Sequence, residues 1–323
     1  MNDKFITNPV SKERNLSIDI LKLFLSFAVV GLHGNIFQDF SPFLSYLFVN
    51  GLARIAVPVF LIISGFYFFE IKSRKQFLNW IKRLMILYLL WMLIYGVFWI
   101  EPKRGVIIRL IIGYFHLWFL IGAVEAFILL WFLRNIKTRN LLIITILCAL
   151  SGLLLQYNHR YHFTEIFNLL YNFVSNASYR NGLFFCFPFI VIGYLINKYK
   201  IIDKWKNIKI AFISSLILLT VESCLNYKYS GFFFDILFSL YLICPLLFIC
   251  VSSIKCYSKN KSLSYYSTGI YLVHFFVQRI LSSNHITKYI ALSETPKVVL
   301  TILLSALITY FLIIARKKFK YIL

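Results

Sequence analysis

Charged residues are scarce in this sequence, and acidic ones most of all. Only 14% of the 323 residues are charged, with 12 Asp and Glu against 34 Lys and Arg, whereas 60% are hydrophobic. A soluble domain of this length cannot bury so much apolar surface in one core. The scarcity of charge therefore excludes an ordinary soluble protein and indicates a polytopic membrane protein.

Cysteine pairs with the spacing of metal or redox sites are absent. The six cysteines lie mostly within or at the edges of apolar runs, and none forms a CxxC pair. Such cysteines pack like small hydrophobic side chains. We therefore expect no bound metal and no disulfide.

The sequence also lacks the features that would divide it into several parts. Its polar beginning, "MNDKFITNPVSKERNLS", has no small-residue cleavage site before the first apolar run, so we expect that run to be retained in the protein. No long polar insertion, low-complexity stretch or repeat interrupts the rest. We predict a cytoplasmic segment at residues 1–15, one membrane domain at residues 16–316 and a cytoplasmic tail at residues 317–323.

Long apolar runs are what the sequence has in abundance. Runs of about 18 to 22 residues recur along the chain, the length that a hydrocarbon layer of ~30 Å requires. A shorter apolar segment at residues 104–114 predicts an interfacial or re-entrant helix. We predict an all-α bundle of about ten transmembrane helices, at residues 16–37, 44–69, 80–100, 115–133, 140–157, 181–196, 210–225, 232–253, 263–281 and 297–315.

The net charge of +22 does not indicate nucleic-acid binding, because the basic residues form short clusters between the apolar runs. With ten spans and a cytoplasmic N-terminus, 24 of the 34 Lys and Arg fall in cytoplasmic segments and nine in outer ones. This asymmetry is typical of the positive-inside rule. We therefore predict that both termini lie in the cytoplasm.

Two proton-bearing groups lie in the first predicted helix, Lys22 near its inner end and His33 near its outer end. A helix rise of ~1.5 Å per residue separates them by roughly 16 Å. Ionisable residues inside a span are costly and are functional candidates. Both residues also have a simpler interpretation. Lys22 would form an ion pair with Asp19 three residues earlier, and His33 would be a hydrogen-bonded packing residue.

Arg54 falls within the second span and cannot shed its charge, so it must face water, a carboxylate or an anionic substrate. Glu125, in the middle of the fourth span, is either the partner of Arg54 or an independent acid or base. Further polar candidates in the middle or outer half of the layer are His116, Arg180, Asn181 and His274. Inner candidates are Lys22, Lys82, Arg83, Ser64 and Gly65.

The chain resembles the membrane acyltransferase family 3, whose members acylate bacterial surface sugars. The similarity runs from Arg14 to Arg316. Its motifs, in order, are "SIDILKLFLSFAVVGLH", "RIAVPVFLIISGFYF", "IKRLMILYLLW", "HLWFL", "RNGLFFCFPFIVIGYLI" and "STGIYLVH".

The resemblance implies a protein of the bacterial inner membrane, with a donor site at the cytoplasmic side and an acceptor site at the outer side. It assigns His33 as the essential histidine and Lys22 as its basic partner near the acyl donor. Lys82 and Arg83 fall in the basic patch of the family, and which of them contacts the donor stays open. Ser64 and Gly65 belong to the motif of the second helix.

The function expected from residues and resemblance together is O-acyl transfer. Acetyl-CoA would supply the acyl group, and the acceptor would be a hydroxyl of a cell-surface polysaccharide or its lipid-linked precursor. His33 and Glu125 are the predicted catalytic residues, and Lys22, Lys82, Arg83, Ser64 and Gly65 are the predicted donor-binding residues. The predicted acceptor-binding residues are Arg54, His116, Arg180, Asn181 and His274.

His33 would act either as a general base or as an acyl carrier. Acyl-CoA, the glycan and membrane lipids are the expected partners, with no permanently bound cofactor and no nucleic acid, and a homo-oligomer is left open. The alternative functions are a membrane transporter of a small molecule or lipid-linked sugar, and a membrane scaffold without activity.

Overall fold

A computed structural model shows how the chain folds. Residues 1–13, most of the predicted cytoplasmic N-terminal segment, lie outside the part that it describes. The described residues are 14–100, 105–161, 163, 175–204, 208–258, 260–283, 287–288 and 292–323.

Helices dominate the described residues, and seven helical segments among them are long and apolar enough to cross a membrane. They confirm seven of the ten predicted spans. The segments are Leu16–His33 (α1), Pro42–Phe68, Arg74–Ile94 (α4), Phe115–Leu133, Thr138–Tyr161 (α8), Ile208–Tyr229 (α12) and Glu294–Ala315 (α16). The second consists of α2 (Pro42–Val49), η1 (Leu52–Ile55) and α3 (Ala56–Phe68), and the fourth of η2 (Phe115–Leu117) and α7 (Trp118–Leu133).

The other three predicted spans also coincide with helices, although two of these are short. They are η4 with α10 (Gly182–Cys186 and Phe187–Lys198), α13 (Leu240–Ser252) and α14 (Ser262–Leu281). The count of ten spans and the cytoplasmic position of both termini stay predictions. Shorter helices are α5 (Gly96–Trp99), α6 (Val106–Ile112), η3 (Ser175–Ser178) and α11 (Ile201–Lys204). Of these, α6 falls within the predicted short helix at residues 104–114.

Some predicted boundaries are wrong. The span predicted at 80–100 is α4 at Arg74–Ile94, and the start of the span predicted at 232–253 differs most. The apolar run at 232–253 predicts a continuous helix, but α13 begins only at Leu240, and residues 231–239 have no regular helix or strand. Phe234, Ile236 and Leu237 of this segment are buried, whereas Phe232, Phe233 and Phe238 are exposed.

Side chains from distant helices satisfy the backbone of this segment. The side chain of Asn50 accepts a hydrogen bond from the N–H of Phe234. The side chain of Gln156 accepts from the N–H groups of Asp235 and Ile236. The side chain of Glu222 accepts from the N–H groups of Phe238 and Ser239, and all five bonds are 2.8–3.2 Å long.

Such irregular backbone is stable at membrane depth only where protein side chains replace the helical hydrogen bonds. The segment therefore depends on the rest of the fold. It also places one carboxylate, Asp235, in the interior of the bundle.

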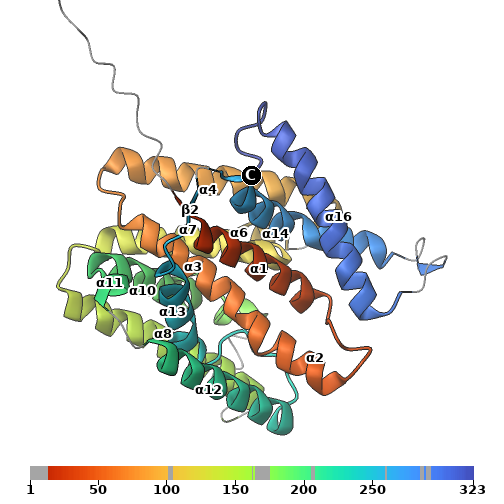
Figure 1. Ribbon diagram of the computed structural model, residues 1–323, viewed down its shortest axis with the longest axis horizontal. Helices are drawn as coiled ribbons and strands as arrows, with labels where there is room; N and C mark the ends of the chain where they lie inside the picture. The colour runs from red at the N-terminus through yellow and green to blue at the C-terminus, as the bar shows by residue number, and fades with distance from the viewer. Residues whose placement is uncertain are drawn as a thin grey trace, which may run out of the picture.

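The helices pack around a centre that contains α1 and α3 (Figure 1). In that view α4 lies along the top, α16 slants along the right side, and α8 and α12 lie at the bottom. Gly65 of α3 and Gly193 of α10 allow these two helices to touch, since a Cβ on either would lie 2.0 Å from a backbone oxygen of the other helix. A two-residue strand pair, β1 (Arg14–Asn15) with β2 (Tyr257–Ser258), joins the start of α1 to the connection before α14.

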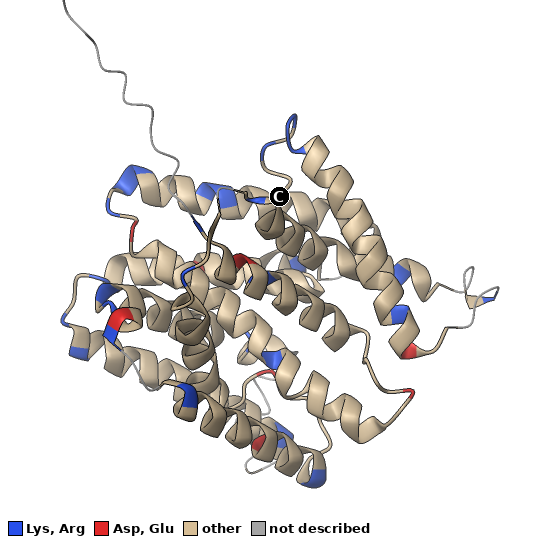
Figure 2. Cartoon of the chain, in the orientation of Figure 1, with Lys and Arg blue, Asp and Glu red and all other residues tan. Residues whose placement is uncertain are grey.

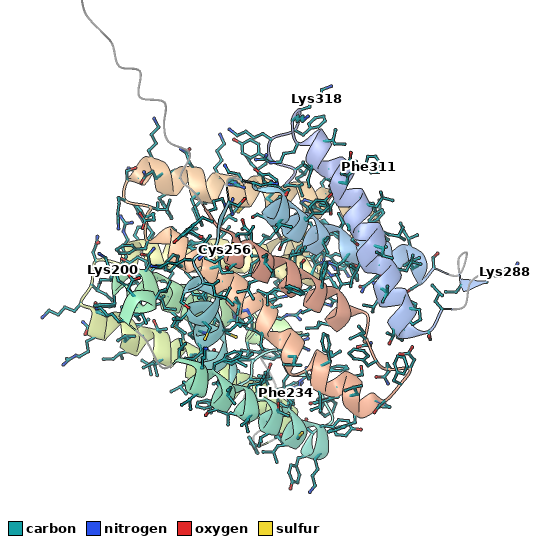
Figure 3. All side chains as sticks on the ribbon, viewed as in Figure 1. Lys200, Phe234, Cys256, Lys288, Phe311 and Lys318 are labelled. Carbon is teal, nitrogen blue, oxygen red and sulfur yellow. The ribbon has the colours of Figure 1, made fainter. Side chains whose placement is uncertain are left out.

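The surface of the bundle matches a membrane environment. Charged residues gather mainly at helix ends and connections, while the long middle stretches of the helices carry few (Figure 2). Large apolar side chains cover the outside, and only 22% of the spanning part of α16 is buried in the protein. Lys288 and Lys318 lie near opposite ends of α16 (Figure 3). The chain is a multi-pass, all-α membrane protein.

Candidate active site

The site begins at the last turn of α1, which ends at His33. Contacts from α14 and α16 hold this turn in place: Gln278 Nε2 donates to the carbonyl of Val30 at 3.1 Å. The next residue, Gly34, approaches α16 so closely that a Cβ would lie 2.3 Å from Val298 Cγ2. The imidazole of His33 is therefore held by neighbouring helices rather than by α1 alone.

Further along the same connection, Asp39 accepts hydrogen bonds from Thr295 at the start of α16, from the hydroxyl at 2.5 Å and from the N–H at 3.3 Å. The Thr295 hydroxyl, followed by other hydrogen bonds, lowers the pKa of this exposed carboxyl. Asp39 is thus favoured as a carboxylate, and the connection after His33 is tied to α16.

Three histidines from separate elements come together beside this turn. The ring of His33 stacks on His274 of α14 at a centroid distance of 5.3 Å, and His116 of η2 lies 5.0 Å from His274. His274 Nδ1 lies 2.7 Å from the carbonyl oxygen of Tyr271. Because a carbonyl only accepts, Nδ1 carries a proton and Nε2 of the neutral ring is left as an acceptor. The three predicted histidines form one group.

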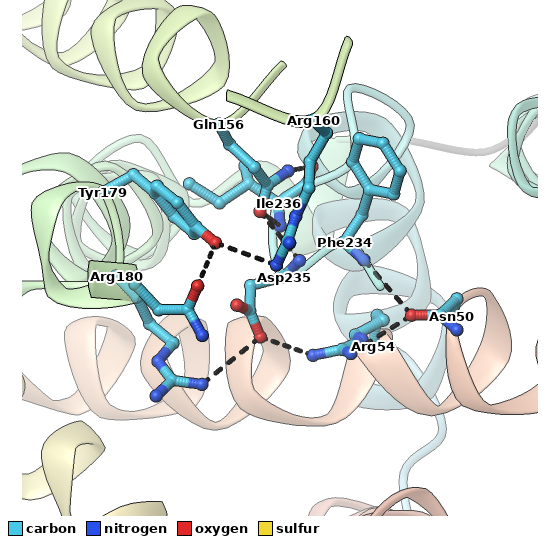
Figure 4. Close-up of polar contacts among 10 residues, drawn as sticks. Asn50, Arg54, Gln156, Arg160, Tyr179, Arg180, Phe234, Asp235 and Ile236 are labelled. Atoms are coloured by element: carbon cyan, nitrogen blue, oxygen red, sulfur yellow. Dashed lines mark hydrogen bonds and ion pairs between the residues drawn. The ribbon is translucent and has the colours of Figure 1, made fainter. Parts of the chain in front are cut away.

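An ionic cluster of Arg54, Arg180 and Asp235 lies beside His33, and Figure 4 shows its contacts. Arg54 Nη1 lies 2.5 Å from Asp235 Oδ1, and Arg180 Nη1 lies 3.6 Å from the same oxygen. Arg54 Nη2 also donates to Asn50 at 3.2 Å, and the guanidinium of Arg180 lies 5.2 Å from the Trp118 ring. The carboxylate partner of Arg54 is thus Asp235, and the expected pairing with Glu125 is wrong.

The ionic cluster and His33 share a cavity of about 50 Å³. Arg54, Arg180, Asp235 and His33 all line it, Trp118 adds an aromatic wall, and apolar residues complete it. In the described part of the chain, no protein group makes a hydrogen bond with the ring of His33. Both ring nitrogens are therefore available to a bound molecule.

Glu125 and Asn181 belong to a neighbouring cavity of about 140 Å³, which also contacts Trp118 and Arg180. Glu125 Oε2 accepts from the N–H of Gly182 at 3.1 Å. Asn181 caps η4, accepting from the N–H groups of Leu183 and Phe184. Glu125 therefore does not line the His33 cavity, and Trp118 with Arg180 separates the two spaces.

The predicted donor-binding residues lie toward the other end of α1. Lys22 Nζ is 3.5 Å from Asp19 Oδ1 and 3.5 Å from the hydroxyl of Ser264, which confirms the expected Asp19 ion pair. Lys82 and Arg83 are exposed on α4, and the charge of Arg83 is near enough to act on Lys22.

In the motif of the second helix, Ser64 is partly buried and Gly65 fully buried. Gly65 has a packing role at the crossing of α3 and α10, where a Cβ would meet the backbone of Ile190. The predicted donor contacts of both residues stay predictions.

Asp235 is not among the site residues predicted from the sequence. The signal that marks it is an acidic residue inside the apolar run "GFFFDILFS", where an unpaired carboxylate would be costly. Its partner was not predictable locally, since 181 positions separate it from Arg54.

The helices and the cavity together define a multi-pass membrane protein with a buried site of histidine, arginine and aspartate. Residues 15–315 match acyltransferase family 3, described as an acyltransferase domain. The chain belongs to this family, which confirms the resemblance found in the sequence.

Curated relatives include an amino-acid racemase from Enterococcus faecalis, 25% identical over 309 residues, which are 86% of this chain and 43% of the relative. A serine/alanine racemase from Enterococcus gallinarum is 25% identical over 259 residues, 72% of this chain and 36% of the relative. The chain thus spans less than half the length of these relatives. No solved structure matches it.

Proposed function

We propose that this protein is a membrane O-acyltransferase that moves an acetyl group from cytoplasmic acetyl-CoA to a glycan. The acceptor is a hydroxyl of a cell-surface polysaccharide or of its lipid-linked precursor. Membership of an acyltransferase family supports the reaction class. The observation that carries the proposal is the position of His33 in a cavity with Arg54, Arg180 and Asp235.

The geometry of α1 supports a donor that approaches from the cytoplasmic side. Lys22 and His33 lie on one continuous helix, roughly 16 Å apart at ~1.5 Å per residue. Lys22 and Arg83 offer positive charge to the phosphates of CoA, and the flexible pantetheine arm would extend from there toward His33. The thioester would then meet the acceptor at the far end of the helix.

In the general-base route, His33 takes the proton of the acceptor hydroxyl while the oxygen attacks the thioester carbonyl. The C–S bond breaks, and the CoA thiolate leaves and regains a proton. In the acyl-carrier route, a ring nitrogen of His33 attacks the thioester carbonyl, the C–S bond breaks and the CoA thiolate leaves. The acceptor oxygen then attacks the acetyl carbonyl, the N–C bond to His33 breaks, and the hydroxyl proton passes to the thiolate or to the freed ring nitrogen. Both routes need a ring nitrogen that is free of protein hydrogen bonds, as the nitrogens of His33 are.

The test is His33→Ala in the full chain, assayed with radiolabelled acetyl-CoA and total surface glycan. Transfer should fall at least ~100-fold, the usual contribution of a general base, while the amount of protein in the membrane stays constant. His159→Ala is the matched control, since His159 lies in α8 and does not line the cavity. Acetylation that survives in His33→Ala would contradict the proposal, and mass spectrometry of acetyl-CoA-treated protein would distinguish the two routes.

A second candidate function is binding or transport of a small amino acid, and the names of the relatives, which are amino-acid racemases, favour it. A carboxylate would suit the two arginines and an ammonium group would suit Asp235. Uptake of labelled serine or alanine by proteoliposomes, without any acetyl transfer, would support this function instead.

A further inference from the structure

The cavity beside His33 carries more positive than negative charge. Two arginines, Arg54 and Arg180, line it together with a single carboxylate, Asp235. One oxygen of that carboxylate faces both guanidinium groups, at 2.5 Å and 3.6 Å. Arginine keeps its proton in proteins, so the group holds one uncompensated positive charge.

Other described carboxylates are not placed to supply the missing negative charge. Glu222 is occupied by hydrogen bonds from the Tyr157 hydroxyl, two backbone N–H groups and the Ser239 hydroxyl. Glu125 lines the neighbouring cavity together with Arg180, but among the described residues it forms no ion pair with that arginine and accepts from a backbone N–H instead. An uncompensated charge in the interior is costly; the side chains of Arg54 and Asp235 are 13% and 12% exposed, and that of Arg180 is 28% exposed. The site is therefore suited to an additional anion.

Hydrogen-bond donors of both arginines are also unused. Arg54 donates through Nη1 and Nη2, but its buried Nε has no partner. Within the described residues, the guanidinium of Arg180 makes only the ion pair at 3.6 Å and the contact with the Trp118 ring. Guanidinium N–H groups form a planar fork that matches the oxygens of a carboxylate or a phosphate.

We propose that the acceptor carries a carboxylate or phosphate group, which Arg54 and Arg180 bind so that a neighbouring hydroxyl faces His33. This inference rests on the proposed function and specifies the acceptor class, an acidic sugar or a polyol phosphate. The phosphates of the donor belong to the other end of α1, where Lys22 and Arg83 lie. The two anions are thus recognised by separate groups of cations.

The test uses the purified full chain in lipid nanodiscs with acetyl-CoA and matched acceptor pairs. The carboxylate pair is methyl glucuronide and methyl glucoside, and the phosphate pair is glycerol phosphate and glycerol. The charged member of at least one pair should have a KM about tenfold lower or better, because a site built for a polar group rejects the analogue that lacks it. Which pair shows the difference identifies the source of the anion.

Variants of Arg180 provide the second arm. Arg180→Gln should remove most of the preference for the charged acceptor, by raising its KM to about that of the neutral one. Arg180→Lys, which keeps the charge without the fork, should retain part of the preference. Arg139→Gln, on the exposed start of α8, is the matched control and should behave as the unmodified protein.

Two results would overturn the inference. One is equal KM values for charged and neutral acceptors in the unmodified protein. The other is an equal fall of kcat for both acceptors in Arg180→Gln, which would mean that the arginine acts on the reacting carbonyl. Calorimetric titration with methyl glucuronide or glycerol phosphate, without donor, separates the two proposals. If the anion binds, Arg180→Gln abolishes this binding, and the protein nevertheless transfers no acetyl group, then the anion site is supported and the proposed function is rejected.

Discussion

Gly65→Ala tests whether the glycine in the motif of the second helix serves packing or donor binding. A Cβ at this position would lie 2.0 Å from the carbonyl oxygen of Ile190, about 1.4 Å closer than the 3.4 Å at which ordinary contact begins. The obstacle is backbone, so no side chain can rotate away. A Cβ on Gly193 would likewise lie 2.0 Å from the carbonyl oxygen of Ile62, so α3 and α10 have no room to slide past each other.

The two helices must therefore separate, and buried contacts along their crossing are lost. Overpacking of this kind costs on the order of 3 kcal/mol. For a chain of this size, we expect the apparent Tm to fall by roughly 5–10 °C. The measurement is the thermal loss of the monodisperse peak in size-exclusion chromatography of the detergent-solubilised full chain.

Gly96→Ala is the matched control, because its Cβ would meet only the flexible end of Ile100 at 3.0 Å. It should change the apparent Tm by no more than about 1 °C, as substitutions outside sensitive positions usually do. If Gly65→Ala is as stable as the control but needs more acetyl-CoA for the same rate, the packing argument is wrong and the glycine contacts the donor.

Asp235→Asn would leave Arg54 and its neighbouring arginine without a counter-charge, a loss on the order of 3–5 kcal/mol. The apparent Tm should fall, and adding Arg54→Gln should restore part of it; a double variant no more stable than the single one would argue against the shared ion pair. Cys256 is exposed in the connection between α13 and α14, which is predicted to be cytoplasmic (Figure 3). In a variant that keeps only this cysteine, an impermeant maleimide should label it after permeabilisation but not in intact cells. In a variant whose only cysteine comes from Tyr229→Cys, at the end of α12 that is predicted to lie outside, the same maleimide should react in intact cells. Labelling of Cys256 in intact cells, and of the Tyr229→Cys variant only after permeabilisation, would mean that the termini lie outside.

Helix positions were largely predictable because of the solvent in which the chain folds. In a hydrocarbon layer each backbone group must find its partner nearby, and a helix provides that partner within four residues. Apolar runs therefore form helices with little dependence on the rest of the chain, as α1, α8 and α16 show. Residues 231–239 are the exception, because Asn50, Gln156 and Glu222 provide their partners from distant helices.

For the site, the residues were predictable one by one but their partners were not. His33, Arg54 and Arg180 were each recognisable as costly polar groups in apolar surroundings. That Arg54 pairs with Asp235, and that Glu125 faces a different cavity, depends on how η1, α7 and the segment before α13 meet in space. Segment order along the chain does not contain this information.

The amino-acid sequence by itself determined the class of protein, the helical segments and the family, because these depend on local composition and on motifs of a few residues. Tertiary structure alone decided which charges meet, which histidines stack and where the interior cavity lies. The physical reason is that ion pairs and ring contacts act over a few ångströms, between residues that the fold brings together from as far as 181 positions apart.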